Sequence, residues 1–244
     1  MKLIFIRHGE PDYVNDFLTS YGKQEAELLS QRLAAIPNIE GCYCSPLGRS
    51  KATAAPTCRA LGMEPIILPW LQEFSGRITD PETGEPRIPW DLKPEYWMGD
   101  PILADESRWT EHPLMQAGNV AESYRATCEG MDELLARHGY RREGRMFCCE
   151  GNRESVILIF CHMAISMAAI GHLTGISPVL LWHHGCMPPS GVTTLMTQER
   201  QPGKVFFRWF QMGDTSHLYA GGVSPSRMAM FQEVYTGTDH TRTR

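Results

Sequence analysis

The chain of 244 residues is 42% hydrophobic and 21% charged, a composition typical of a soluble globular protein. Its length fits one large α/β domain, and its net charge of −5 gives no support for binding to nucleic acid or to an anionic membrane surface. No apolar run approaches the ~20 residues of a membrane span, and the first residues lead into an apolar segment without a visible signal peptide.

Short apolar strands and amphipathic helices are predicted to alternate along the sequence. Ala26, Leu29 and Leu33, for example, recur at steps of three and four residues and favour a helix with one buried face. Ser45 and Pro46 are typical of an N-cap and a first helical turn, and they predict the start of the next helix. The predicted strands cover residues 3–6, 41–44, 65–68, 155–161, 192–197 and 205–210, and the predicted helices cover 21–36, 45–60, 119–138 and 163–174. This order predicts an α/β fold, a three-layer α/β/α sandwich around a mostly parallel central sheet, in a single domain over residues 1–244.

Residues 75–118 interrupt the alternation. This segment is rich in proline and contains Trp90, Trp97 and Trp109, whose large side chains favour burial over disorder. Because a long connection inside a compact domain is usually functional, we expect an inserted cap over the active site. A packed surface insertion remote from the chemistry is the alternative.

The C-terminal tail, residues 222–244, is the segment whose structure the sequence defines least. Met228, Met230 and Phe231 favour docking of this tail on the domain or on a second subunit. The sequence leaves the oligomeric state open.

The eight cysteines lack the paired spacing of a zinc site. With no visible secretory signal, reduced and mostly buried thiols are expected, which favours a cytoplasmic location. No metal site is expected among the histidines either, because His183 and His184 are adjacent and would point apart in a strand. Four further histidines are interpreted as structural: His112, His138, His172 and His217.

Cationic and imidazole groups follow three of the predicted strands. Arg7 and His8 come directly after the first strand, Arg49 lies one turn into the helix after the second, and His162 follows the strand that ends at residue 161. In open α/β sheets ligands bind at the carboxyl ends of the strands, so these groups are expected to meet on one face. A histidine beside a fixed cation is consistent with an ion pair, a metal ligand or a nucleophile toward phosphorus.

Eight ordered motifs resemble the histidine phosphatase (phosphoglycerate mutase-like) superfamily, and they span nearly the whole chain. The first four are RHGE (7–10), DFLTSYGKQEAELLS (16–30), CSPLGRSKATAAP (44–56) and LQEFSG (71–76). The last four are AGNVAES (117–123), ILIFCHMA (157–164), PPSGVTTL (188–195) and GDTSHL (213–218).

The resemblance implies a role for each group at the strand ends. His8 would be the nucleophile, since a neutral imidazole is not repelled by a phosphate dianion and leaves a labile phosphohistidine. Arg7, Arg49 and His162 would bind the phosphate, and Glu73 would protonate the leaving oxygen. Three nearby carboxylates are rival donors: Asp80, Glu82 and Glu85. No metal ion or organic cofactor is implied.

Two positions depart from the family's pattern. Val14 stands where the family usually has Asn, so one phosphate contact is either lost or supplied by Asn15 or Tyr13. Met163 follows the second histidine where the family has Gly; its backbone N–H remains able to donate to phosphate. A methionine at this position also disfavours the acid phosphatase and phytase branch, whose proton donor directly follows the second histidine.

The motifs resemble most the broad-specificity phosphatase branch of the superfamily. The implied function is hydrolysis of the phosphomonoester of a small metabolite. A cofactor-dependent mutase is the first alternative, although the segment PDYVND after RHGE is shorter than the mutase loop. A weakly catalytic sensor of a phosphorylated ligand is the second. The identity of the substrate is not defined by the sequence.

Overall fold

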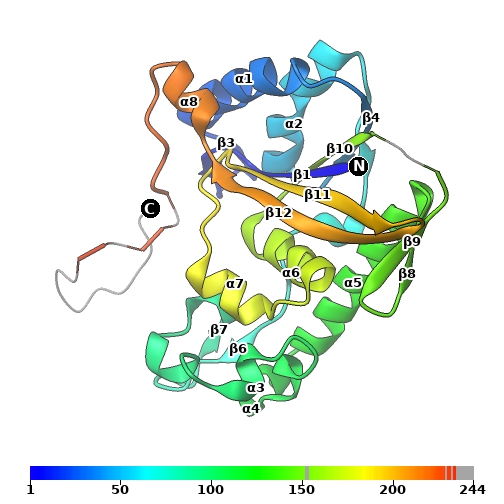
Figure 1. The fold of residues 1–244 in the computed structure, drawn as a ribbon. Helices are drawn as coiled ribbons and strands as arrows, with labels where there is room; N and C mark the ends of the chain where they lie inside the picture. Colours follow the sequence, from blue (N-terminus) through cyan, green and yellow to red (C-terminus); the bar gives the residue numbers. More distant parts are fainter. Residues whose placement is uncertain (152–153, 229, 232, 235–244) are drawn as a thin grey trace.

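The computed structural model describes residues 1–151, 154–228, 230–231 and 233–234. An eight-stranded sheet lies between two layers of helices, with α1, α2 and α8 on one face and α5, α6 and α7 on the other (Figure 1). The helices are α1 (Ser20–Ala34), α2 (Gly48–Leu61), α5 (Val120–Arg137), α6 (Met163–Thr174), α7 (Pro178–His184) and α8 (Ser216–Ala220). The predicted three-layer α/β sandwich is therefore confirmed.

The sheet has a parallel half and an antiparallel half. In spatial order its strands are β5 (Ile66–Ile67), β4 (Ile39–Cys44), β10 (Val156–Cys161), β1 (Lys2–Arg7), β11 (Val192–Gln201), β12 (Lys204–Asp214), β9 (Met146–Cys149) and β8 (Tyr140–Glu143). The first four are parallel to one another, whereas β11, β12, β9 and β8 pair antiparallel. The β8–β9 hairpin was not predicted, because its strands are short and only partly buried.

The parallel half carries the groups expected at the strand ends. β1 pairs with β10 so that Arg7 lies opposite Cys161, and β10 pairs with β4 so that Phe160 lies opposite Cys44. The carboxyl ends of these strands are therefore level with one another. These strands are almost wholly buried because helices cover both faces, which explains their continuous apolar sequences.

The start of α2 differs from the prediction. Ser45 is not its N-cap, since the helix begins at Gly48 with Leu47 before it. The first N–H is satisfied from outside the helix, because Gly48 N donates to Asp16 Oδ2 at 2.6 Å. The hydroxyl of Ser45 is instead used by His162, at 2.8 Å from its Nε2.

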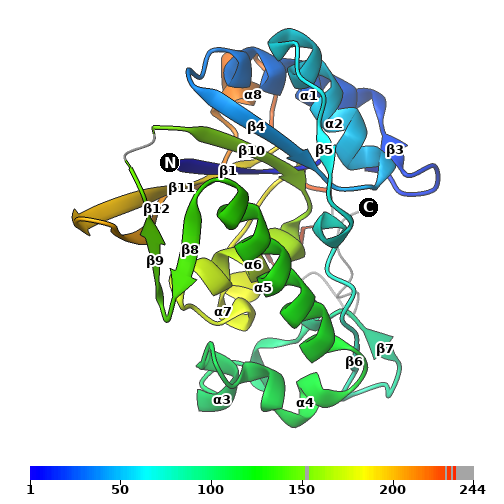
Figure 2. The same cartoon turned by 90° about the vertical axis from the view of Figure 1, so that its right-hand side faces the viewer.

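Residues 75–118 form a layer of their own beyond α5–α7, at the bottom of both ribbon views (Figure 2). The segment holds β6 (Ile78–Thr79), β7 (Pro86–Arg87), α3 (Pro101–Ala104), α4 (Pro113–Gln116) and the 3₁₀ turns η2 (Pro89–Asp91), η3 (Pro94–Tyr96) and η4 (Trp109–Glu111). Its three tryptophans are buried. Trp109 packs edge-on against Trp182 of α7, with ring centroids 5.4 Å apart, so the insertion and the domain share one hydrophobic core.

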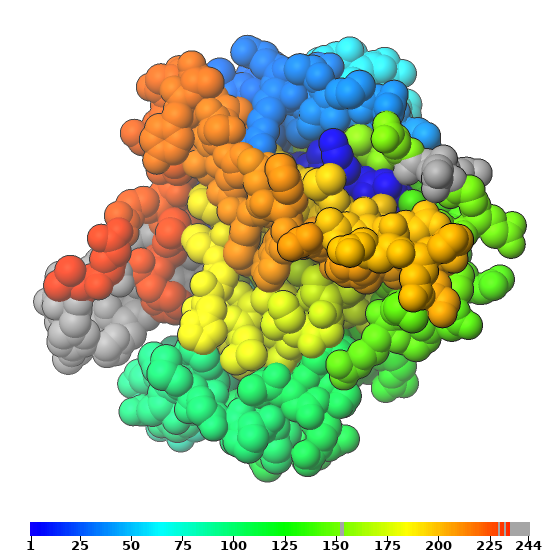
Figure 3. Space-filling view, viewed as in Figure 1, coloured from blue at the N-terminus to red at the C-terminus, as the bar shows by residue number. Residues whose placement is uncertain are grey.

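Smaller elements complete the chain. The hairpin of β2 (Pro11–Asp12) and β3 (Phe17–Leu18) follows β1, and η1 (Pro69–Leu71) follows β5. Part of the tail lies along one flank of the molecule (Figure 3), where Ser226 donates to Glu10 Oε2 at 2.6 Å. Of the predicted tail, residues 229, 232 and 235–244 lie outside the described residues. Within the described residues, no helix is both long enough and apolar enough to cross a membrane.

The shared core predicts that the insertion and the domain unfold together. Trp109 is fully buried, so Trp109→Ala should lower the free energy of unfolding by about 3–5 kcal/mol. Denaturant titration followed by circular dichroism should still show one transition. Met98→Ala is the control, because Met98 lies in the same segment but is 61% exposed, and its effect should stay within about 0.5 kcal/mol. Two separate transitions in the native protein would contradict the shared core.

Candidate active site

His8 lies at the end of β1, buried at 3% exposure. Its Nδ1 lies 2.8 Å from the carbonyl oxygen of Gly9. A carbonyl oxygen only accepts, so Nδ1 carries the proton and the lone pair is on Nε2. Burial lowers the pKa of His8 well below its usual value, and the nearby Arg7 and Arg49 lower it further. The ring is therefore held neutral, with a nucleophilic nitrogen.

His162 lies beside His8, with ring centroids 5.1 Å apart. It precedes α6 and is fully buried, and burial lowers its pKa well below the usual value. Its Nε2 lies 2.8 Å from Ser45 Oγ, which also accepts from Leu47 N at 3.2 Å. Nδ1 of His162 is buried and has no hydrogen-bond partner among the described residues. In the tautomer in which Nε2 accepts from the Ser45 hydroxyl, the proton of the neutral ring is on Nδ1. Nδ1 is then a buried donor without an acceptor in the described part of the chain.

Two arginines supply positive charge at the same edge of the sheet. Arg7 is 4% exposed, and its Nη1 donates to the carbonyl oxygen of Met187 at 2.6 Å. Arg49 lies in the first turn of α2 and donates to Asp16 Oδ1 at 2.5 Å. The guanidinium of Arg49 also lies over the ring of Tyr13, 5.5 Å from its centroid. These contacts hold both side chains in place before any ligand arrives.

Glu73 enters from the segment after β5 and η1. Its Oε1 accepts from Phe74 N at 2.9 Å and from Ile165 N at 3.1 Å. Burial raises the pKa of Glu73, although the two N–H groups and the arginines oppose this shift. The carboxyl group therefore keeps its proton to higher pH than an exposed glutamate would.

A cavity of about 200 Å³, here called the histidine cavity, joins most of the predicted residues. Its lining residues are Arg7, His8, Tyr13, Arg49, Glu73, Ile88, Trp90 and Met163. The predicted phosphate ligand His162 is not among these lining residues, although its ring neighbours that of His8. Asn15, the other predicted contact, donates instead to Asp12 Oδ2 at 2.6 Å in an exposed loop.

The three rival carboxylates do not line this cavity. Asp80 pairs with Arg87 at 2.9 Å and Glu82 pairs with Lys93 at 2.6 Å, both on the insertion. Glu85 is exposed next to β7. Of the four candidate acids, Glu73 is the one that the fold brings to His8.

Glu25 of α1 is a buried acid of this region that the sequence analysis missed. It is fully buried, and its Oε2 accepts from Glu10 N at 2.6 Å, two residues after His8. Burial raises its pKa to about 7, and the neighbouring Glu10 adds to the shift. A signal was present in the sequence, because Glu25 precedes Leu29 and Leu33 at four-residue steps on the apolar face.

A sequence model of the histidine phosphatase superfamily (branch 1) matches residues 3–209. The chain belongs to this superfamily. The match includes the strand ends that carry the histidine cavity, and the predicted family is confirmed.

Solved structures support the same fold for this histidine phosphatase superfamily member. A phosphoserine phosphatase mutant from Entamoeba histolytica, in complex with phosphoserine, is 22% identical with a TM-score of 0.57, covering 89% of this chain and 98% of that chain. A mycobacterial glucosyl-3-phosphoglycerate phosphatase is 17% identical with a TM-score of 0.59, covering 87% of this chain and 98% of that chain.

Among curated protein sequences, a PE-PGRS family protein of Mycobacterium tuberculosis is 35% identical over 112 residues, which is 41% of this chain and 19% of that protein.

The buried carboxyl of Glu25 predicts a pH dependence of stability. The pKa of this carboxyl is about 7 in the folded protein and 4.5, the ordinary value for glutamate, in the unfolded chain. Between these two pH values the unfolded chain loses the proton while the folded protein keeps it. Stability should therefore fall as the pH rises through this window and level off above it. Glu25→Gln should raise the free energy of unfolding at pH 8 by up to about 3 kcal/mol, with little change at pH 4.

The measurement is urea unfolding of both proteins across this pH range. Glu27→Gln is the matched control on the same helix, because the Glu27 side chain is 62% exposed, and its effect should stay within about 0.5 kcal/mol. Equal pH profiles for native protein and Glu25→Gln would show that Glu25 is ionised in the folded state.

Proposed function

We propose that this protein hydrolyses phosphomonoesters of small metabolites through a phosphohistidine on His8. The observation that carries the proposal is the neutral His8, whose Nδ1 proton is donated to the carbonyl of Gly9 and whose side chain lines a cavity together with two arginines. A phosphate ester is held there by charge-assisted hydrogen bonds, and the imidazole attacks phosphorus without repulsion between anions.

The two arginines stabilise the negative charge on the oxygens of the transferred phosphoryl group. Arg7 reaches the cavity from the end of β1 and Arg49 from the first turn of α2, and the two side chains are fixed by Met187 and Asp16. Phosphoryl transfer depends mainly on such positioning and electrostatic stabilisation. The buried Nδ1 of His162 would find its missing acceptor in a phosphate oxygen.

Glu73 serves as the general acid of the first step. The P–O bond to the alcohol breaks as the bond from His8 Nε2 to phosphorus forms, and the proton of Glu73 passes to the leaving oxygen. Its raised pKa favours the protonated form that this step needs. Water then attacks phosphorus and gives a proton to the Glu73 carboxylate, while the bond from phosphorus to His8 Nε2 breaks. Inorganic phosphate leaves, and His8 and Glu73 both return to their starting states.

The class of substrate follows from the same proposal. Similar structures are named for phosphatases of phosphoserine and of glucosyl-3-phosphoglycerate, both small phosphorylated metabolites. We assign the protein to a reducing compartment such as the cytoplasm, because all eight cysteines, each within the described residues, carry free thiols. The proposed reaction uses no metal ion, so activity should persist in a strong chelator.

The covalent intermediate gives the direct test. Rapid quenching during turnover should trap a phosphoprotein that is stable to base and labile to acid, and His8→Ala should abolish it together with about 10³-fold or more of the rate. His138→Ala is the control, since His138 pairs with Tyr43 and lies outside the cavity. Steady release of free phosphate separates a phosphatase from a mutase. A protein that binds phosphate esters without trapping or release would refute the proposal in favour of a sensor.

The role of Glu73 can be tested by the basicity of the leaving group. Glu73→Gln should slow phosphorylation of His8 by an alkyl phosphate about 10²-fold or more, because an alkoxide needs a proton to leave. With 4-nitrophenyl phosphate the loss should be about tenfold or less, because nitrophenolate leaves unprotonated. The step is measured by rapid quench, with Glu85→Gln as the control. Equal losses with both esters would rule out proton donation by Glu73.

A further inference from the structure

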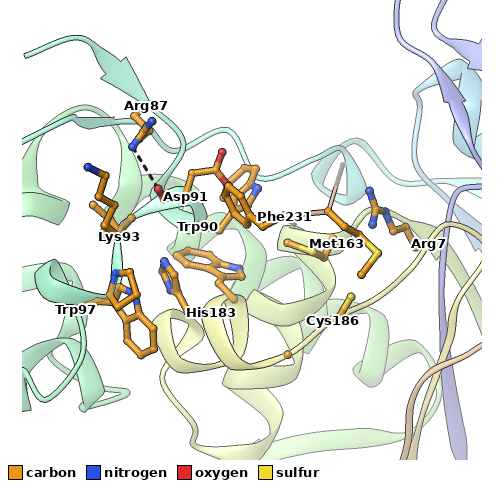
Figure 4. Close-up of a pocket in the computed structure, with 15 residues that line it drawn as sticks. Arg7, Arg87, Trp90, Asp91, Lys93, Trp97, Met163, His183, Cys186 and Phe231 are labelled. Atoms are coloured by element: carbon orange, nitrogen blue, oxygen red, sulfur yellow. Dashed lines mark hydrogen bonds between the residues drawn. The ribbon is translucent and has the colours of Figure 1, made fainter. Parts of the chain in front are cut away.

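A second and larger cavity lies beside the histidine cavity and has no part in the steps above. It has a volume of about 410 Å³ and lies between the insertion, α7 and the C-terminal segment (Figure 4). Trp90 and Trp97 come from the insertion, Trp182 from α7 and Phe231 from the C-terminal segment. We call it the tryptophan cavity.

The two cavities share part of their walls. Arg7, Trp90 and Met163 line both of them. The alcohol portion of an ester whose phosphate is bound in the histidine cavity would therefore lie next to the tryptophan cavity. This adjacency makes the larger space the candidate site for the alcohol.

The walls of the tryptophan cavity are mainly aromatic and apolar. Trp90, Trp97 and Trp182 are each at most 6% exposed, and Phe231 is 47% exposed. Trp97 is held by His183, which stacks on it at 4.7 Å between ring centroids. Rigid aromatic walls favour a flat apolar ligand, and the volume lies in the range of sites that enclose drug-sized molecules. A three-carbon alcohol such as serine would leave most of the space unfilled.

The charges at the end of the cavity on the insertion disfavour an anionic alcohol. Arg87 and Lys93 line this end, but Arg87 pairs with Asp80 at 2.9 Å and Lys93 pairs with Glu82 at 2.6 Å. Asp91 lines the same end, and both cations there are already paired with carboxylates of the insertion. A second anionic group on the substrate would have to displace an existing ion pair.

We infer that the preferred substrate is the phosphate ester of a bulky, uncharged alcohol that carries an aromatic ring, with the ring held in the tryptophan cavity. This inference rests on the proposed phosphatase function. It assigns the insertion and the C-terminal segment to recognition of the alcohol, while the strand ends recognise the phosphate.

The test compares phosphate esters of primary alcohols, so that the leaving oxygens have similar basicity. Naphthylethyl phosphate should exceed glycerol phosphate and hexyl phosphate in kcat/KM by about tenfold or more, mainly through a lower KM. Phosphoserine, whose alcohol is a zwitterion, and phosphocholine, whose alcohol is a cation, test charged alcohols, and both should be poorer substrates still.

Two variants test whether the residues that line the tryptophan cavity cause the preference for an aromatic alcohol. Cys186 lines the cavity from the loop after α7 (Figure 4), and Cys186→Trp should fill part of the space. Phe231→Ala removes one wall. Each change should reduce the ratio of kcat/KM for naphthylethyl phosphate to that for glycerol phosphate by about fivefold or more. Tyr219→Ala is the control, because Tyr219 is 68% exposed on α8 and lies outside both cavities.

The outcomes separate this inference from the proposed function. Equal turnover of all the esters, a preference for hexyl phosphate, phosphoserine or phosphocholine, or an unchanged ratio in both variants would overturn the inference and leave the phosphatase function intact. Turnover of none of the esters would overturn the proposed function, and the inference with it.

Discussion

The site depends on the register in which parallel strands end at one edge of the sheet. Arg7 lies opposite Cys161, and Phe160 lies opposite Cys44, so three strands stop at the same level. The residues that follow them supply both imidazoles and the hydroxyl that contacts the second ring. A slip of one residue in either pairing would turn these groups to the other face of the sheet, because side chains alternate along a strand.

Burial has opposite effects on the two kinds of titratable group at this edge. It lowers the pKa values of His8 and His162 and raises the pKa of Glu73. The arginines strengthen the first effect and weaken the second, since a positive neighbour disfavours imidazolium and favours carboxylate. One desolvated space therefore holds a neutral base and a carboxyl that keeps its proton more readily, which is the combination that attack and protonation of a leaving group require.

The sequence was sufficient for the family, the layers and the positions of His8 and His162, because apolar strands with distinctive residues at their ends leave a local signal. It was insufficient where a side chain has two possible partners. Ser45 was interpreted as a helix cap, yet its hydroxyl is taken by a histidine that is distant in sequence. The helical pattern places Glu25 on the apolar face of α1, but its hydrogen bond with the loop after β1 is a tertiary contact that the pattern does not define. The tryptophan cavity could not be predicted either, since segments that are remote from one another in the sequence form its walls.

The two outer strands of the sheet have a consequence for how copies of this chain can meet. β5 is only two residues long, and β8 reads Tyr-Arg-Arg-Glu, with charged side chains along the outermost strand. Short edge strands and charged edges both discourage a second chain from adding its own strand. Continuation of the sheet across a molecular boundary, and the fibrous aggregation that follows from it, is therefore disfavoured at both ends.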